Sequence, residues 1–325
     1  MNNGATQGTK WFLVVNPISG SGKGLDDFPL ISKLLRDNGI SCEAVFTEHK
    51  HHATELTVSA ITAGYRHIMV AGGDGTLHEV INGLFIQKCV DTSEVTIAVI
   101  PVGTGNDWIR MYGLPTRYSA VIRAIKEGYT FLQDVAAVEY EESRYRQTRY
   151  MANVAGVGFD AAVIKRGQMM NGNDKKKKGA GFYIRALINT FFRYKPTGVK
   201  IWVDDRLMYN NLLFSLAMGV GKYNGGGIQQ LPQSVADDGL LDVTLIKPIH
   251  WWHVVFRLRR FFNGEIYSIG HVQHLQGSKI RIESSPEIDL EIDGELHGGT
   301  PVELRVLHRA VKVIVNKSFI DKLKA

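Results

Sequence analysis

The sequence has little of what marks secreted, membrane-spanning or metal-thiolate proteins. Only two of its 325 residues are cysteines, Cys42 and Cys89, and their spacing excludes a disulfide framework or a cysteine-based metal site. The longest apolar run, residues 212–220, has about half of the ~18 residues that a spanning helix needs. Residues 1–10 lack the apolar core of a signal peptide. We therefore expect a cytoplasmic protein that crosses no membrane.

Charge of one sign is only slightly in excess. The net charge of +6 and the pI of about 9.1 favour anionic partners, such as phosphate or an acidic membrane surface. No arginine-rich aromatic stripe accompanies this charge, so we expect no nucleic-acid partner. The length exceeds what one ordinary core accommodates, which favours two domains.

The first half alternates apolar strands with helices. Short apolar runs end in glycine-rich or polar turns, and helical patterns follow them. The expected strands cover residues 11–15, 42–47, 67–71 and 96–100. This alternation predicts a parallel α/β sheet, in which ligands bind beyond the carboxyl ends of the strands.

The pattern changes after about residue 134, where short strand-like runs predominate. They cover residues 135–140, 150–157, 199–203, 212–220, 241–246, 279–283, 288–292 and 302–306. Helical insertions are expected near residues 181–193 and 250–263. A second, mostly β domain is therefore predicted.

The strongest chemical signal is the turn Gly72-Gly73-Asp74-Gly75-Thr76, between a strand and a helix. Its glycines let the backbone approach a ligand, and the N–H groups at the start of the next helix suit a phosphate. Asp74 makes sense among these donors if Mg²⁺ lies between it and the phosphates. The structural alternative is a tight turn with an aspartate cap, which we disfavour because other glycine loops accompany it.

Two further glycine loops follow strands, and neither is decisive alone. Residues 103–107, Gly-Thr-Gly-Asn-Asp, suit a phosphate or cap a helix that begins near Trp108. Residues 16–24 fail as a P-loop, because Pro17 replaces the first glycine of that motif and Gly24 its Mg²⁺-binding hydroxyl. In the second half, Asp238 and residues 293–295 (Asp-Gly-Glu) adjoin glycine turns that indicate hairpins when taken alone.

Together these motifs resemble the diacylglycerol kinase catalytic-domain family, which includes sphingosine kinases and is related to NAD kinases. Asn-Pro-x-Ser-Gly, Gly-Gly-Asp-Gly-Thr, Gly-Thr-Gly-Asn-Asp, Asp-Asp-Gly-Leu-Leu-Asp-Val and Asp-Gly-Glu occur in the family's order over residues 10–316. The resemblance implies an α/β domain at 10–134, a β-sandwich at 135–310 and a segment at 311–325 that returns to the first domain. It also implies ATP and Mg²⁺, with the nucleotide between the two domains.

The resemblance further implies which residues act. ATP would meet Asn16, Thr47, Gly73, Asp74, Gly75, Thr76, Leu77, His78, Glu79 and Thr104. A structural Mg²⁺ would be held by Asp238 and by the backbone carbonyls of Val235 and Leu240. Glu295 would accept the proton of the lipid hydroxyl, Asp74 would act on the catalytic Mg²⁺, and Asp293, grouped with the nucleotide site, would orient its loop. We expect Asp74→Ala to abolish activity with little loss of stability.

The function expected from the resemblance is an ATP-dependent lipid kinase acting on diacylglycerol or a related lipid. A sphingoid base, a soluble acceptor such as a dinucleotide, or binding without catalysis stay open as alternatives. Contact with an anionic membrane is expected, through the lysines at 175–178 or through the aromatic and basic segment 250–262, although both could be ordinary surface or packing segments. The oligomeric state is open, a homodimer included.

Overall fold

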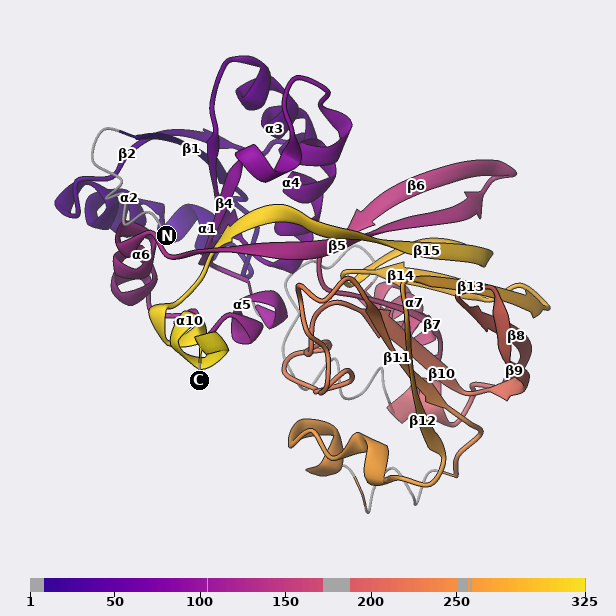
Figure 1. Cartoon of the computed structure of the whole chain (residues 1–325). Helices are drawn as coiled ribbons and strands as arrows, with labels where there is room; N and C mark the ends of the chain where they lie inside the picture. Colours follow the sequence, from indigo (N-terminus) through magenta and orange to yellow (C-terminus); the bar gives the residue numbers. More distant parts are fainter. Residues whose placement is uncertain (1–8, 104, 172–187, 251–256, 258, 325) are drawn as a thin grey trace. The chain divides into compact units, whose positions relative to one another are not determined.

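A computed structural model describes residues 9–103, 105–171, 188–250, 257 and 259–324. The chain folds into two units (Figure 1). Unit 1 comprises the described residues up to Asp134 together with those from Arg309 onward, and unit 2 is Val135–His308. Two strands, β5 (Thr130–Glu142) and β15 (Glu295–Ile314), run from one unit into the other.

Unit 1 is built on a parallel sheet, as the alternating pattern predicts. Its strands are β1 (Lys10–Val15), β2 (Ser41–Phe46), β3 (His67–Gly72) and β4 (Thr96–Pro101), in the order β4-β3-β1-β2. The end of β15 adds a parallel strand beside β4, pairing Lys312 with Thr96. Strands β1, β3 and β4 are almost wholly buried, which explains their continuous apolar sequences.

Helices cover both faces of this sheet. Its helices are α1 (Lys23–Asp26), α2 (Phe28–Asp37), α3 (His52–Thr62), α4 (Asp74–Ile86), α5 (Asp107–Met111), α6 (Tyr118–Glu127) and α10 (Lys317–Lys324), with a 3₁₀ turn at Thr92–Glu94. The chain reverses direction across the sheet after β2, so right-handed crossovers place α2 on one face and α3 and α4 on the other. Helix α10 is attached to unit 1 by Phe319, which packs edge-on against Tyr112 and Phe131.

Unit 2 is antiparallel. Besides parts of β5 and β15, it contains β6 (Tyr145–Met151), β7 (Val154–Gly158), β8 (Thr197–Val203), β9 (Arg206–Leu213), β10 (Ser215–Gly219), β11 (Leu241–Ile246), β12 (Val272–Gly277), β13 (Lys279–Ser285) and β14 (Asp289–Ile292). One series runs β12-β11-β10-β7-β14-β15, and another runs from β15 through β13 and β8 to β9. Apolar side chains from both series share one core, which includes Val157, Leu216, Ile280 and Leu304.

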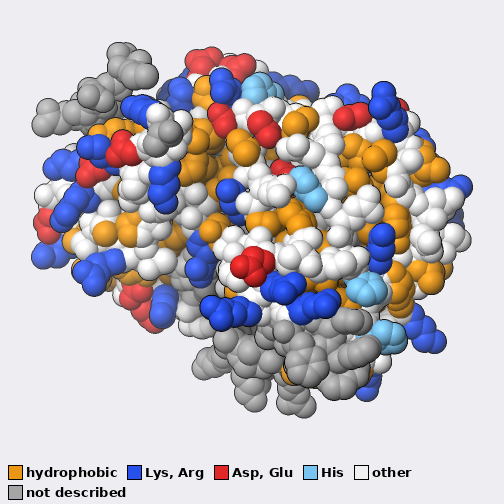
Figure 2. All heavy atoms as spheres, turned by 60° about the horizontal axis from the view of Figure 1, so that its bottom comes forward, with side chains coloured by type: hydrophobic (Ala, Val, Ile, Leu, Met, Phe, Trp, Pro, Cys, Tyr) orange, Lys and Arg blue, Asp and Glu red, His pale blue; other side chains and the backbone are white. Residues whose placement is uncertain are grey.

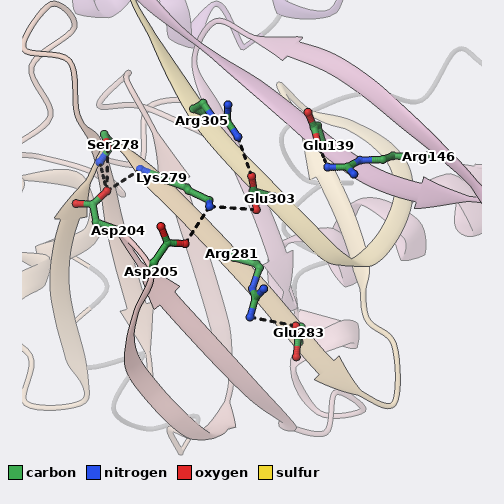
Figure 3. Close-up of polar contacts among 10 residues, drawn as sticks. All are labelled: Glu139, Arg146, Asp204, Asp205, Ser278, Lys279, Arg281, Glu283, Glu303 and Arg305. Atoms are coloured by element: carbon green, nitrogen blue, oxygen red, sulfur yellow. Dashed lines mark hydrogen bonds and ion pairs between the residues drawn. The ribbon is translucent and has the colours of Figure 1, made fainter.

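The outward side of the β8, β13 and β15 strands is charged. Lys279 lies between Asp205 and Glu303, with N–O distances of 2.9 and 3.7 Å (Figure 3). Arg281 lies over the ring of Trp202, with its guanidinium carbon 4.2 Å from the ring centroid. These acids all have basic neighbours, as expected for the solvated face of a sheet whose other face forms the core.

Several elements of unit 2 differ from the sequence prediction. Residues 150–157 form not one strand but the end of β6 and most of β7, because a bend at 152–153 separates them. Helix α7 (Phe159–Asn171) was not predicted, since its apolar residues follow no clear helical period. Strands β9 and β12 also went unrecognised. Of the two predicted helical insertions, residues 188–191 and 259–262 are helical, and the remainder lies largely outside the described residues.

Candidate functional site

Two glycine loops of unit 1 touch each other where neighbouring strands end. Strands β3 and β4 are adjacent and parallel, so the loops that follow them begin side by side. A Cβ added to Gly103 would lie 2.6 Å from the Cα of Gly73 and 3.0 Å from the side-chain oxygen of Asn106. Such contacts are too short, so this approach of two backbones requires glycine.

The loop that follows β1 contacts the two glycine loops that follow β3 and β4. Gly20 has a φ of +61°, and a Cβ there would lie 2.2 Å from the carbonyl oxygen of Val102. Asn16 donates from Nδ2 to Oγ1 of the buried Thr76, at 2.9 Å. We call the meeting point of residues 16–24, 72–76 and 101–103, with Gly105, the glycine cradle. It is rich in glycine and in backbone groups, as a site for a triphosphate should be.

Helix α4 starts inside the glycine cradle. Its N-cap is Gly73, in an extended conformation with no side-chain cap, and the helix has 13 residues. The first N–H groups of such a helix have no partner within it, and its dipole favours a negative charge there. Gly73, Gly75 and Thr76 therefore lie at a position suited to phosphate oxygens, and their contact with ATP stays a prediction.

Asp74 ties two loops of the cradle together. Its carboxylate oxygens accept the backbone N–H groups of Asp107 and Trp108, each at 3.2 Å. These are the first N–H groups of α5, so Asp74 caps a helix that begins 33 residues later. This geometry argues against the expectation that Asp74→Ala costs little stability, because the substitution leaves two helix-terminal donors without these acceptors.

The rest of the predicted stretch serves unit 1 differently. Leu77 and His78 are buried inside unit 1. The Glu79 carboxylate accepts the N–H groups of His51 at 3.0 Å and Ala53 at 3.1 Å, at the start of α3. A nucleotide contact by these three residues would therefore need their backbone rather than their side chains.

Thr47 and Thr104 complete the predicted nucleotide set. Thr47 follows β2 and donates its N–H to the carbonyl of Val15 at 2.8 Å, which extends the pairing of β1 and β2 by one residue. Thr104 lies outside the described residues. Their contact with ATP stays a prediction.

The Asp-Gly-Glu motif of unit 2 forms a hairpin between β14 and β15. Asp293 is buried, and its carboxylate accepts three backbone N–H groups, from Ala152, Asn153 and Val154, at 3.0 to 3.1 Å. This side chain fixes the turn against the bend between β6 and β7, consistent with the orienting role expected from the resemblance. Glu295 is half-buried and opens β15, where it pairs with Ile292.

The predicted Mg²⁺ loop lies before β11. The Asp238 side chain is exposed, its Oδ1 accepts the N–H of Leu240 at 3.0 Å, and its Oδ2 lies 3.3 Å from Nε2 of Gln276. Val235 is 42% exposed. A carboxylate with backbone carbonyls nearby in the chain is an all-oxygen donor set, which suits Mg²⁺.

Asp242, in the same motif, is fully buried. Its Oδ1 lies 2.6 Å from Nε2 of His274, whose ring packs on Tyr267. Burial raises the pKa of Asp242, against the opposing effect of His274. The aspartate therefore connects β11 to β12 through His274.

A small apolar pocket in unit 2 was missed at the sequence level. It lies between α7 and strand β10, and Phe159, Phe191, Phe214 and Ile246 form its walls. Two carboxyl groups line it, Asp160 and Glu291. One signal in the sequence could have revealed Glu291. It is a charged residue between Leu290 and Ile292, in a strand that is buried on both faces.

Burial changes the acidity of both groups. It raises the pKa of Glu291 to about 8, and the charges of Asp160 and Asp293 add to the effect. It also raises the pKa of Asp160 to about 6, against the stabilising hydrogen bond from Gln230. Carboxyl groups perturbed in this way within a pocket are candidates for a functional site.

Sequence comparisons identify the family. Residues 10–138 match the diacylglycerol kinase catalytic domain, and residues 153–315 match the YegS C-terminal NAD kinase beta sandwich-like domain. The chain belongs to the diacylglycerol kinase catalytic-domain family. The predicted fold class, a parallel α/β domain followed by a β-sandwich, is thereby confirmed.

Individual relatives span nearly the whole chain at modest identity. A diacylglycerol kinase of Mycobacterium tuberculosis is 25% identical over 302 residues, covering 93% of each chain. A diacylglycerol kinase of Bacillus subtilis is 25% identical over 317 residues, covering 96% of this chain and 98% of its own. A crystal structure from Bacillus anthracis has a TM-score of 0.76 at 24% identity, covering 98% of this chain and 99% of that one, and shows the shared fold.

Proposed function

We propose that this protein is a lipid kinase that transfers the γ-phosphate of ATP to a hydroxyl group of diacylglycerol or a related lipid. The observation that carries the proposal is the glycine cradle, where Gly73 and Gly103 approach too closely to allow a Cβ on Gly103. Phosphoryl transfer depends mainly on positioning and on neutralising charge, and backbone donors at a helix start supply both.

The other residues then have definite roles. A catalytic Mg²⁺ beside Asp74 would neutralise phosphate charge. A separate, structural Mg²⁺ would be held by the carboxylate of Asp238 with the backbone carbonyls of Val235 and Leu240. Asp293 fixes the hairpin that presents Glu295, through its three N–H acceptor contacts. We propose that Glu295 takes the proton of the acceptor hydroxyl. The apolar pocket of unit 2 suits hydrocarbon of the acceptor lipid.

A lipid kinase must also reach its substrate in a bilayer. Among the described residues, no helix is long and apolar enough to cross a membrane. We propose peripheral contact through residues 259–262, where Phe262 is exposed beside Arg259, whereas Phe261 packs with the apolar cluster of Phe159 and Phe214. Figure 2 shows lysine and arginine side chains among apolar ones on one face of the molecule. Such a mixture suits an anionic interface.

The direct test is product identification. Purified full-length protein is incubated with labelled ATP, Mg²⁺ and mixed micelles of single lipids, with a dinucleotide as a soluble acceptor in a parallel reaction. We expect label in a lipid product and none in the dinucleotide. Transfer to the dinucleotide alone, or no transfer to any acceptor, would refute the proposal.

Glu295→Gln tests the assignment of the base. The amide keeps the size of the side chain and cannot accept the proton, so turnover should fall by about 10²- to 10⁴-fold with ATP binding intact. Glu303→Gln is the matched control, because Glu303 lies on the same strand and pairs with Lys279 and Arg305 on the charged face. Equal activity of the two variants would remove Glu295 from the mechanism.

The membrane proposal has its own assay. Flotation with vesicles containing anionic lipid should recover less of an Arg259→Ala/Phe262→Ala variant than of the wild type, since each arginine contributes about 1 kcal/mol at such a surface. Binding equal to the wild type would discard this contact surface.

A further inference from the structure

Three side chains that can ligate a metal meet in unit 1, at the loop between β2 and α3. His49 lies in the loop, His52 opens α3, and Glu55 lies one turn further along the helix. Each offers one ligand atom, and the three atoms lie within 4.8 Å of one another. In the part of the chain that the structure describes, no other three histidine, cysteine or acidic side chains come together in this way.

The spacing of this cluster is close to that of a metal site. The rings of His49 and His52 are stacked, with centroids 4.5 Å apart and planes 13° apart. Nε2 of His49 lies 3.9 Å from Oε2 of Glu55, and the two side chains are 56% and 63% exposed. Ligand atoms around a tetrahedral Zn²⁺ lie about 3.4 Å apart. Because these side chains are free to rotate, a small movement brings their atoms to that separation.

The His49 ring already has the hydrogen on the nitrogen that faces away from the cluster. Its Nδ1 lies 3.0 Å from the carbonyl oxygen of Lys50. A carbonyl only accepts, so in the neutral ring Nδ1 donates, and the lone pair is on Nε2, the nitrogen near Glu55. A backbone carbonyl on the second nitrogen is a common partner of metal-bound histidine.

The His52 ring has to change its hydrogen bonding to bind a metal. Its Nδ1 accepts the N–H of Glu48 at 3.0 Å, so the neutral ring carries its hydrogen on Nε2. A metal on Nδ1 displaces that N–H, and a metal on Nε2 moves the ring hydrogen to Nδ1. In either case the hydrogen bond from Glu48 is lost. The bond is exposed, so water can replace it at little cost.

The positive end of α3 is offset by carboxylates. A helix start disfavours a cation, because its dipole is positive there. The Glu79 carboxylate accepts the N–H groups of His51 and Ala53 at that start, and Glu55 adds negative charge in the first turn. Nδ1 of His51 lies 3.9 Å from Oε1 of Glu79, so this third histidine of the loop is directed to Glu79.

We propose that His49, His52 and Glu55 bind a divalent transition-metal ion such as Zn²⁺, with water in the remaining position. Two imidazole nitrogens and a carboxylate oxygen suit Zn²⁺, whereas Mg²⁺ prefers oxygen ligands. The site is therefore separate from both Mg²⁺ positions of the proposed kinase, and its existence does not depend on that reaction. A bound ion links the loop after β2 to the first turn of α3.

Calorimetry with zinc chloride tests the proposal on the full-length protein, without ATP and with Mg²⁺ in excess. We expect the wild type to bind Zn²⁺ under these conditions. His49→Gln and Glu55→Gln should each weaken this binding by at least about tenfold, because loss even of a partner behind a ligand costs about 10- to 100-fold. Both side chains are exposed, so the variants should fold as the wild type does.

The matched control is His51→Asn, which removes a histidine from the same loop. Residue 51 has a φ of +66°, a conformation that asparagine tolerates. This variant should keep the wild-type affinity for Zn²⁺. A wild type that binds no Zn²⁺, or His49→Gln and Glu55→Gln variants that bind it as the wild type does, would overturn the proposal. So would a tenfold loss in His51→Asn, because the ligand set would then be a different one.

The two proposals can fail independently. Phosphorylation of a lipid by a protein that binds no Zn²⁺ would leave the kinase standing and remove the zinc site. Binding of Zn²⁺ that depends on His49 and Glu55, without phosphorylation of any lipid, would do the reverse.

Discussion

The glycine cradle of unit 1 and the pocket of unit 2 differ in what forms them, backbone in the first and side chains in the second. The glycine cradle of unit 1 is backbone brought close to backbone, with Gly73 against Gly103 and Gly20 against Val102. The pocket of unit 2 is made of side chains, with two acids against aromatic walls. The comparison teaches that short runs of consecutive residues supply the glycine cradle, whereas the pocket is assembled from residues far apart in the sequence.

A substitution that fills the glycine cradle should have the largest effect. In Gly103→Ala the new Cβ would lie 2.6 Å from the Cα of Gly73, so one of the two loops must move. Overpacking of this kind costs about 1–3 kcal/mol. We expect ATP affinity, measured by calorimetry, to fall by about tenfold or more.

The matched control for that change is Gly270→Ala, since a Cβ at Gly270 has nothing within 4 Å. It should bind ATP as the wild type does. If Gly103→Ala also kept full affinity, the contact between the loops would not define the nucleotide site.

Asp74 tests whether side chains matter within the cradle. Asp74→Ala removes the acceptors of the N–H groups of Asp107 and Trp108, and should lower the free energy of unfolding by about 1–3 kcal/mol in urea titrations. Asp74→Asn keeps one carbonyl acceptor and should lose less stability. Both should lose kinase activity, because neither supplies a carboxylate to Mg²⁺. An Asp74→Ala variant as stable as the wild type would show that the cap is unimportant.

The pocket of unit 2 should make stability depend on pH. Glu291 has its pKa raised to about 8 by burial, above its ordinary value of 4.5, so the native state binds the proton more tightly than the unfolded state. Stability should therefore fall as pH rises from about 4.5 to about 8, by at most about 1.4 kcal/mol per pH unit.

Glu291→Gln removes that titration. Its unfolding temperature should depend less on pH than that of the wild type, with the gain in relative stability greatest near pH 8. Parallel curves for both proteins from pH 5.5 to 8.5 would mean that Glu291 is ionised in the native state throughout.

The smallest effect is expected on the charged face. The hydrogen bond from Lys279 lowers the pKa of Asp205, whereas burial raises that of Glu291. The Asp205 side chain faces solvent. Asp205→Asn should leave the unfolding temperature unchanged at physiological salt, because exposed ion pairs contribute little. A marked fall in the unfolding temperature would break the distinction between the exposed, paired Asp205 and the buried Glu291.

The sequence was most informative where structure is local. Continuous apolar strands followed by glycine turns predicted the parallel sheet of unit 1, and the order of the motifs predicted the family, which the comparisons confirm. It was least informative for α7, whose apolar residues lack a helical period, and for residues 150–157, which the bend at 152–153 divides. The catalytic and binding roles assigned to individual residues stay predictions.

By itself, the sequence determined where the strand-end loops lie, because an apolar strand that ends in several glycines marks a turn within a few residues, and glycine permits the conformations that such a turn needs. Only the tertiary structure decided that Asp74 caps α5 and that Glu291 meets Asp160 across Gly156. Those relations join residues far apart in the chain. The pKa of a carboxyl group depends on burial and neighbouring charges, which come into existence only when the chain has folded.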